Sequence, residues 1–399
     1  MKHNRLTITL CLALIGVTFS PAFGNHLTGT LISPELLVAG DFNQDGNLDV
    51  VVNDTGFDHV AILLGDGQGG FTLGGHYPTD NLPKGLQVGD VNRDGRLDIV
   101  TCNNWGYDET VLLGDGLGAF HTAAPPNEVD GDGEPVRMIL KDFNNDGLLD
   151  IASNAPDDSK ILLFFGDGKG NFPGPEVEVE DINRPFGMQS ADLNRDGKMD
   201  MVVLSANPNG NSRVNVLLGD GTGQFAATTL VVNNVPTSVQ IGDINNDGKL
   251  DFVVAGTQPE SHNPNFIQTF LGNGRGGFRL QQTITMDKGN LKGDICLGDF
   301  NEDGKLDLCF PKTGNQDGNG TRSTIMFVFI GDGAGNFTQT QTLEVGGEPH
   351  TVITADFNHD GHLDLADTNR ADGTVTCLLG DGQGNFTVSS TTSVLSAEE

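Results

Sequence analysis

The stretch Asp41-Phe42-Asn43-Gln44-Asp45-Gly46-Asn47-Leu48-Asp49 decides the fold, because its pattern Asp-x-Asn-x-Asp-Gly-x-x-Asp occurs seven times in the chain. The copies begin at Asp41, Asp90, Asp142, Asp192, Asp243, Asp299 and Asp356, at intervals of 49 to 57 residues. A second motif, Gly-(Asp/Asn)-Gly-x-Gly-x-Phe, follows each copy and begins at Gly65, Gly114, Gly166, Gly219, Gly272, Gly331 and Gly380. Self-similarity at a regular period is typical of repeat architectures, so we predict seven complete units.

The residues between the motifs are short, β-branched runs that are interrupted by glycine, and they leave no room for a helix of ordinary length. In the fifth unit we expect strands at Val239–Ile241, Leu250–Ala255, Phe266–Leu271 and Phe278–Ile284. Repeated units of four strands close radially into a propeller. We therefore predict an all-β fold, a single seven-bladed β-propeller over residues 25–399 with four antiparallel strands per blade and blades that start near 34, 83, 135, 185, 236, 292 and 349.

One large apolar side chain has a fixed place in every unit, the phenylalanine that ends the glycine motif. A role in stacking on a ligand is conceivable for one such ring, but seven equivalent rings favour packing. We expect these rings to lie between neighbouring blades. They are Phe71, Phe120, Phe172, Phe225, Phe278, Phe337 and Phe386.

The nine-residue pattern, which we call the Asp-Gly loop and number from one to nine, has the donors of a calcium site. Calcium takes oxygen ligands, and positions one, three, five and nine offer carboxylate or amide oxygens, with a backbone carbonyl at position seven. The glycine at position six permits a sharp turn. An EF-hand is excluded because position twelve is never Glu and β-formers follow the loop. An ion-free turn is the alternative, since Asp, Asn and Gly favour turns.

We predict up to seven Ca²⁺ ions as cofactors, and the lack of Cys and the all-oxygen donor set disfavour zinc and copper. The expected ligands are Asp41, Asn43, Asp45, Asn47, Asp49; Asp90, Asn92, Asp94, Arg96, Asp98; Asp142, Asn144, Asp146, Leu148, Asp150; Asp192, Asn194, Asp196, Lys198, Asp200; Asp243, Asn245, Asp247, Lys249, Asp251; Asp299, Asn301, Asp303, Lys305, Asp307; and Asp356, Asn358, Asp360, His362, Asp364, where the seventh position of each loop contributes only its carbonyl.

The first residues have the features of a secretory signal peptide over residues 1–24: Lys2 and Arg5, an apolar run over residues 6–19, and small residues before a cleavage point after Gly24. We therefore expect a protein that is secreted, to the periplasm or the extracellular space. The formal net charge is −32. So acidic a chain repels nucleic-acid phosphates and anionic lipid, and we therefore expect neither nucleic acid nor membrane insertion. We also expect a monomer.

The cysteines beyond the predicted signal peptide match no zinc-binding spacing, and they lie in apolar, strand-like stretches. Buried free thiols are the simplest interpretation. Cys296 and Cys309 flank one Asp-Gly loop, so they are expected to be cross-strand neighbours and could form a disulfide in an exported protein.

With both motifs present in every unit, residues from about 34 to 395 resemble the FG-GAP/VCBS repeat family, which includes the propellers of integrin α-chains and many exported bacterial proteins. The resemblance implies the propeller fold and calcium binding. Integrin propellers carry the calcium loop in only some blades, whereas here all seven units have it, so the chain looks more like the bacterial and lectin-type members. The resemblance does not identify a partner, because one fold hosts many functions.

For function, we expect an extracellular binding or adhesion module for a glycan or a protein. The Asp-Gly loops and the glycine motifs should share one face of the propeller, which leaves the opposite face for a ligand. Trp105, Tyr107 and Tyr77 are candidate ligand-binding residues there, because aromatic rings with a polar edge are favoured at binding surfaces; ordinary loop packing is the alternative. We expect no catalytic residues, although a polysaccharide lyase or hydrolase, or a structural assembly component, are the other candidates.

Overall fold

The computed structural model describes residues 33–123, 134–173, 177–180, 182–205, 212–232, 235–257, 265–286, 293–313 and 322–395. Within these ranges the protein is all-β, and its 28 strands form seven antiparallel sheets of four strands each. No helix in the described ranges is long and apolar enough to cross a membrane. The seven-bladed propeller predicted from the repeats is confirmed.

The strands are β1 (Pro34–Gly40), β2 (Asp49–Asp54), β3 (His59–Gly65), β4 (Phe71–Pro78), β5 (Pro83–Gly89), β6 (Asp98–Asn103), β7 (Asp108–Gly114), β8 (Phe120–Thr122), β9 (Met138–Lys141), β10 (Asp150–Ala155), β11 (Lys160–Phe164), β12 (Val177–Val179), β13 (Pro185–Ala191), β14 (Asp200–Ser205), β15 (Ser212–Gly219), β16 (Phe225–Val232), β17 (Val235–Gly242), β18 (Asp251–Thr257), β19 (Asn265–Gly272), β20 (Phe278–Met286), β21 (Cys296–Gly298), β22 (Asp307–Lys312), β23 (Ile325–Gly331), β24 (Phe337–Glu344), β25 (Pro349–Ala355), β26 (Asp364–Asn369), β27 (Thr374–Gly380) and β28 (Phe386–Ser393).

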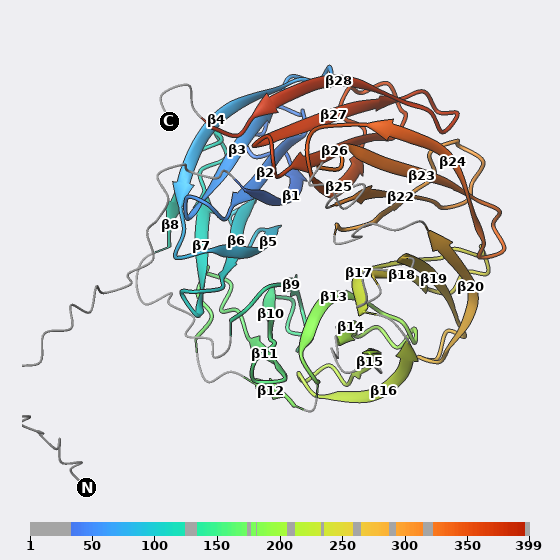
Figure 1. The fold of residues 1–399 in the computed structure, drawn as a ribbon. Helices are drawn as coiled ribbons and strands as arrows, with labels where there is room; N and C mark the ends of the chain where they lie inside the picture. Colours follow the sequence, from blue (N-terminus) through green and yellow to red (C-terminus); the bar gives the residue numbers. More distant parts are fainter. Residues whose placement is uncertain are drawn as a thin grey trace, which may run out of the picture. The chain divides into compact units, whose positions relative to one another are not determined.

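Each sheet keeps its four strands in chain order, with the first strand nearest the axis of the ring and the fourth at the rim (Figure 1). The second strands are buried at every residue, as β2 and β6 are, except for the last residue of β18 and of β22. They read as near-continuous apolar runs because both of their faces are covered by neighbouring sheets. The fourth strands are mostly exposed or half-buried, as β28 is beyond its buried Phe386, because they lie at the rim with only one face covered.

Seven apolar clusters hold the ring together, one between each pair of neighbouring sheets. The cluster between the first two sheets, for example, contains Val51 and Ile62 from one sheet and Ile99 and Leu112 from the next. The other clusters join the remaining pairs in order, and the last joins the seventh sheet to the first. The core is therefore distributed around the ring and is not concentrated at one place.

The phenylalanine that ends each glycine motif lies in one of these clusters, which confirms the predicted packing role. Phe120 contacts Phe42, the second residue of the preceding Asp-Gly loop, edge-to-face at a centroid distance of 5.7 Å. Phe71 meets Phe357 in the same way at 5.5 Å, across the junction between the seventh and the first sheet. Aromatic pairs favour this geometry. The second position of each loop is thus the apolar partner of the next blade's glycine motif.

The ring closes through side chains, since each described sheet is built from one continuous stretch of chain. At the axis, the buried Glu35 carboxylate of β1 accepts hydrogen bonds from Lys84 at 2.7 Å and pairs with Arg370, which follows β26, at 3.2 Å. At the rim, the Ser390 hydroxyl donates to the Gly69 carbonyl at 2.8 Å. Residues 27–32, which could have paired with the last blade, lie outside the described residues.

The described cysteines are all buried free thiols. Cys296 lies directly opposite Cys309 in the β21–β22 pair, as expected for cross-strand neighbours, and the two sulfurs are not bridged.

Candidate metal loops and ligand-binding surfaces

All seven Asp-Gly loops have the same backbone conformation. The residue at position four has a positive φ of 54–64° in every loop, although it is never glycine; the seven residues are Gln44, Arg93, Asn145, Arg195, Asn246, Glu302 and His359. Position six is always glycine, with φ between 77° and 90°. A side chain there would be strained, so the glycine is required by the turn. The conformation is therefore a property of the repeated pattern and not of one blade.

Side-chain oxygens hold this turn. In every loop one oxygen of the position-one Asp accepts the N–H of the position-six glycine at 2.7–3.0 Å. The Asn at position three accepts the N–H of position five at 2.9–3.1 Å. The Asp at position five accepts the N–H of position seven at 2.8–3.1 Å. The oxygens that we predict as metal ligands are thus already positioned by the backbone.

The Asp at position nine has a second role that the sequence did not indicate. Both of its oxygens accept backbone N–H groups: one from position two of its own loop at 2.8–3.1 Å, the other from the first glycine of the glycine motif at 2.7–3.0 Å. All seven of these side chains are fully buried. Burial raises the pKa of Asp98, Asp150 and Asp307 to about 6, against the opposing effect of the two N–H groups.

The first glycine of the glycine motif allows the two motifs to approach each other. A Cβ at Gly65 would lie 2.1 Å from the carbonyl oxygen of Leu48, and the equivalent glycines are as tightly placed. The motifs therefore share one face of the propeller, as predicted. Neighbouring loops also touch: Gln44 donates to the Gly95 carbonyl at 3.1 Å, and Asn246 to the Gly304 carbonyl at 2.8 Å.

The donor set of the loops fits a hard cation such as calcium, because it consists of carboxylate, amide and carbonyl oxygens. One buried oxygen supports the fit: Oδ1 of Asp356 has no hydrogen-bond partner among the described residues. In the arrangement seen here, however, no three acidic, histidine or cysteine side chains of the described ranges converge as a metal cluster.

The three aromatic candidates on the opposite face do not form one patch. Trp105 and Tyr107 lie in the turn between β6 and β7 and are 65% and 46% exposed. The turn is anchored to the preceding blade connection by the Trp105 N–H, which donates to the Asn81 carbonyl at 3.2 Å. Tyr77 instead packs edge-to-face on Phe120, and its hydroxyl donates to the Gly118 carbonyl at 3.2 Å. Tyr77 thus belongs to the packing between the first two sheets.

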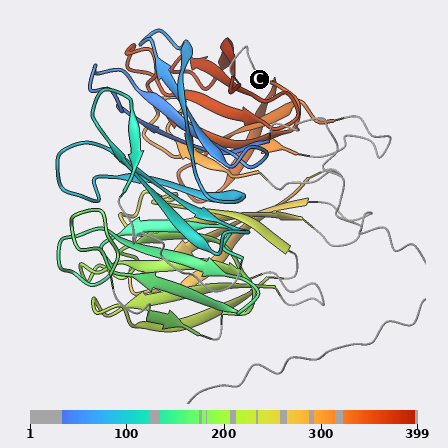
Figure 2. The same cartoon turned by 90° about the vertical axis from the view of Figure 1, so that its left-hand side faces the viewer.

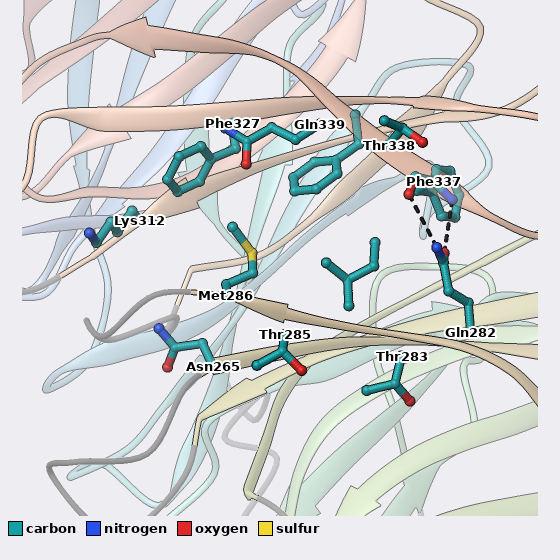
Figure 3. A pocket seen from close by; sticks show the side chains of 12 residues that line it. Asn265, Gln282, Thr283, Thr285, Met286, Lys312, Phe327, Phe337, Thr338 and Gln339 are labelled. Carbon is teal, nitrogen blue, oxygen red and sulfur yellow. Dashed lines mark hydrogen bonds between the residues drawn. The ribbon is translucent and has the colours of Figure 1, made fainter.

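A cavity of about 580 Å³ opens between the fifth and sixth sheets (Figure 3). Its floor and walls come from β20 on one side and from β23 and β24 on the other, and Gln282 crosses the gap to bond both backbone groups of Phe337 at 2.8 and 3.3 Å. The lining residues are Asn265, Gln282, Thr283, Ile284, Thr285, Met286, Lys312, Phe327, Phe329, Phe337, Thr338 and Gln339.

Sequence reasoning missed this cavity. The only signal was the largely polar run of residues 282–285 in β20, which resembles the exposed side of any fourth strand. Only the assembled ring shows that this part of β20 faces β23 and β24 across a cavity.

Comparison with protein-family models supports the repeat assignment. The model of the FG-GAP-like repeat matches residues 41–101, 142–203, 202–254 and 243–310, which is more than half of the chain. No curated protein matches the chain.

Several solved structures share the fold at low sequence identity. A lectin from Agrocybe aegerita that recognises non-reducing terminal N-acetylglucosamine is 20% identical, with a TM-score of 0.57 over 90% of this chain and 93% of the lectin. BBS1N, solved in complex with ARL6DN, is 9% identical, with a TM-score of 0.55 over 86% of this chain and 92% of its own. A protein from Lactobacillus plantarum is 13% identical, with a TM-score of 0.57 over 90% and 96%. These likenesses show the fold alone.

Proposed function

The chain belongs to the FG-GAP-like repeat family, and from this premise we propose that it is an exported, calcium-stabilised binding module that recognises a glycan or a protein. The fold itself suggests a binding module. Calcium would act as a scaffold on one face, which leaves the gaps between blades and the opposite face for a ligand. Export is proposed from the signal-like features of residues 1–24. Mass spectrometry of protein recovered outside the producing cell should then find Asn25 at the N-terminus.

For the metal, the loop oxygens at positions one, three, five and nine, with the carbonyl at position seven, are the groups that would hold calcium. Carboxylate oxygens that accept one N–H keep a lone pair for a cation. Bound calcium would supply positive charge to loops that each contain three aspartates, and so would relieve their mutual repulsion. Its contribution to stability follows from mass action, because an ion that binds only the folded chain stabilises it.

For the ligand, the cavity between the fifth and sixth sheets is the observation that favours a glycan. Its volume of about 580 Å³ is in the range of small-molecule sites, roughly 300–1,000 Å³. Its lining combines amide and hydroxyl groups, such as Thr283 and Gln339, with the partly exposed ring of Phe327. Hydroxyl groups of a sugar need such hydrogen-bonding partners, and the apolar face of a sugar ring can lie on an aromatic side chain. The lectin of the same fold, which binds N-acetylglucosamine, makes amino sugars a sensible first probe.

A glycan array probed with the full chain tests the proposal. We expect binding of one or a few glycans, weakened about tenfold or more in Phe327→Ala, because removal of a contact worth ~1.5 kcal/mol costs about a factor of ten. Trp105→Ala serves as the matched aromatic control, since this exposed ring lies in the second blade.

Loss of binding in Trp105→Ala with full binding in Phe327→Ala would move the ligand to the exposed β6–β7 turn. An array without any bound glycan would contradict glycan recognition. A protein ligand would then remain as the alternative, and the same two variants would be compared for binding to a protein captured by the full chain.

A further inference from the structure

A second cavity, of about 350 Å³, lies on the axis of the propeller. Five of the seven sheets contribute to its lining, together with Val136 and Arg137 just before β9 of a sixth, which only a position at the centre of the ring permits (Figure 1). We call it the axial pocket. Its lining residues are Glu35, Lys84, Val136, Arg137, Phe186, Val235, Pro236, Thr237, Thr257 and His350.

The axial pocket lies on the face opposite to the Asp-Gly loops. Glu35, Lys84 and Phe186 are each the second residue of the first strand of a sheet, while the Asp-Gly loops follow the far ends of the same strands. Figure 2 views the sheets edge-on, with the turns of the two faces on opposite sides of the ring. The pocket is thus separated from the predicted metal loops by the full length of the innermost strands.

Charge distinguishes this pocket from the rest of the molecule. The whole chain carries a formal charge of −32. The charged groups at the pocket are the lining residues Lys84, Arg137 and Glu35 with their ion-pair partners Arg370 and Asp294, which together are three cations and two carboxylates. Glu35 is already paired with Lys84 and with Arg370. Burial lowers the pKa of His350 to about 4, so its ring is neutral near pH 7. A concave site with an excess of positive charge attracts anions.

Arg137 has donors to offer. It uses one N–H for the Val136 carbonyl at 3.1 Å and another for the Asp294 carboxylate at 3.2 Å. A guanidinium carries five N–H groups, so donors remain for a ligand beyond these contacts. The side chain is only 16% exposed, and its position is fixed by the two bonds it makes. A charge-assisted bond from such a preordered group is stronger than one from a mobile surface cation.

The remaining lining is largely apolar. Phe186 keeps 36% of its surface exposed, and the side chains of Val136, Val235 and Pro236 lie around the same space. We propose that the axial pocket binds a small organic carboxylate, with the carboxylate held by Arg137 and Lys84 and an apolar or aromatic body placed on Phe186 and Pro236. This site is independent of the glycan site and of calcium.

Calorimetric titration of the full chain with 3-phenylpropionate, and with its neutral amide as the matched ligand, tests the proposal. We expect saturable binding of one carboxylate per chain and binding of the amide weaker by roughly tenfold or more, because a charge-assisted hydrogen bond is lost. Arg137→Met should weaken binding of the acid to a similar degree. Arg213→Met, which removes the same charge from an exposed site on β15, should leave it unchanged.

A second variant guards against misfolding of Arg137→Met. Asp294→Asn removes the acid that competes for Arg137, so it should tighten binding of the acid severalfold and leave the amide unaffected. Absence of saturable binding by the carboxylate, equal binding of acid and amide, or weaker binding in Asp294→Asn would each overturn the proposal.

Discussion

Removal of a buried position-nine carboxylate should destabilise the propeller whether or not calcium is present, and Asp150→Ala is the most direct case. Asp150 is fully buried, and its two oxygens accept the N–H of Phe143 at 2.8 Å and of Gly166 at 3.0 Å. Each bond to a charged acceptor contributes ~1.5–3 kcal/mol. Relief of the cost of burying the carboxylate offsets part of the loss, so we expect a net destabilisation of about 2–4 kcal/mol.

Two measurements in excess chelator test this value. The urea midpoint, followed by circular dichroism, should fall in Asp150→Ala, and the exchange of the Phe143 and Gly166 amides with deuterium should accelerate, since exchange reports local opening. Asp146→Ala is the matched control: it removes an exposed aspartate of the same loop that accepts one N–H, and it should cost less than about 1 kcal/mol. An unchanged midpoint in chelator, or a loss of stability that arises only with calcium present, would contradict a structural role of the Asp150 carboxylate.

Two further predictions concern the axis. Glu35→Ala should lower the free energy of unfolding by about 2–4 kcal/mol at pH 7, because it leaves Lys84 and Arg370 without their buried partner. Burial raises the pKa of Glu35, but the neighbouring cations lower it by more, so the folded chain holds this carboxylate below its usual pKa of 4.5. The contribution of Glu35 to stability should therefore be lost as the pH falls below 4.5, which chemical denaturation at pH 7 and pH 3 can check. Burial lowers the pKa of His350 to about 4, so the imidazole is protonated in the unfolded chain before it is protonated in the folded chain as the pH drops below 6.5. Between pH 6.5 and 5 the wild type should therefore lose roughly 2 kcal/mol more stability than His350→Asn. Equal losses of unfolding free energy in the two proteins over this pH range would contradict the prediction.

Much of the fold could be predicted because the same two motifs occur in all seven repeats. The strands expected at Phe266–Leu271 and Phe278–Ile284 lie within β19 and β20, and the phenylalanine that ends each glycine motif packs where one apolar ring per blade must pack. Periodicity reveals what all units share: the local turn, the strand lengths and the contacts between adjacent blades.

The sites were harder to predict because they depend on residues that differ between repeats. Glu35, Lys84 and Arg137 stand alone in three separate blades, and only closure of the ring brings them to one axis. Tyr77 differs from the exposed Trp105 because its ring packs between two sheets. No pattern in the sequence distinguishes a packed tyrosine from an exposed one. The two hydrogen bonds that the position-nine Asp accepts from backbone N–H groups could not be predicted for another reason. A carboxylate that binds a metal and one that accepts backbone hydrogen bonds look the same in a sequence.

We propose that the seven Asp-Gly loops bind calcium as part of the folded structure. Calorimetric titration of chelator-treated full chain with CaCl₂, with metal content measured after dialysis and thermal unfolding followed in parallel, tests it most directly. We expect up to seven bound Ca²⁺ per chain, a melting temperature that rises with calcium concentration, and a smaller effect of Mg²⁺ at equal concentration. A chain that retains no calcium and melts at the same temperature in chelator and in millimolar calcium would contradict it.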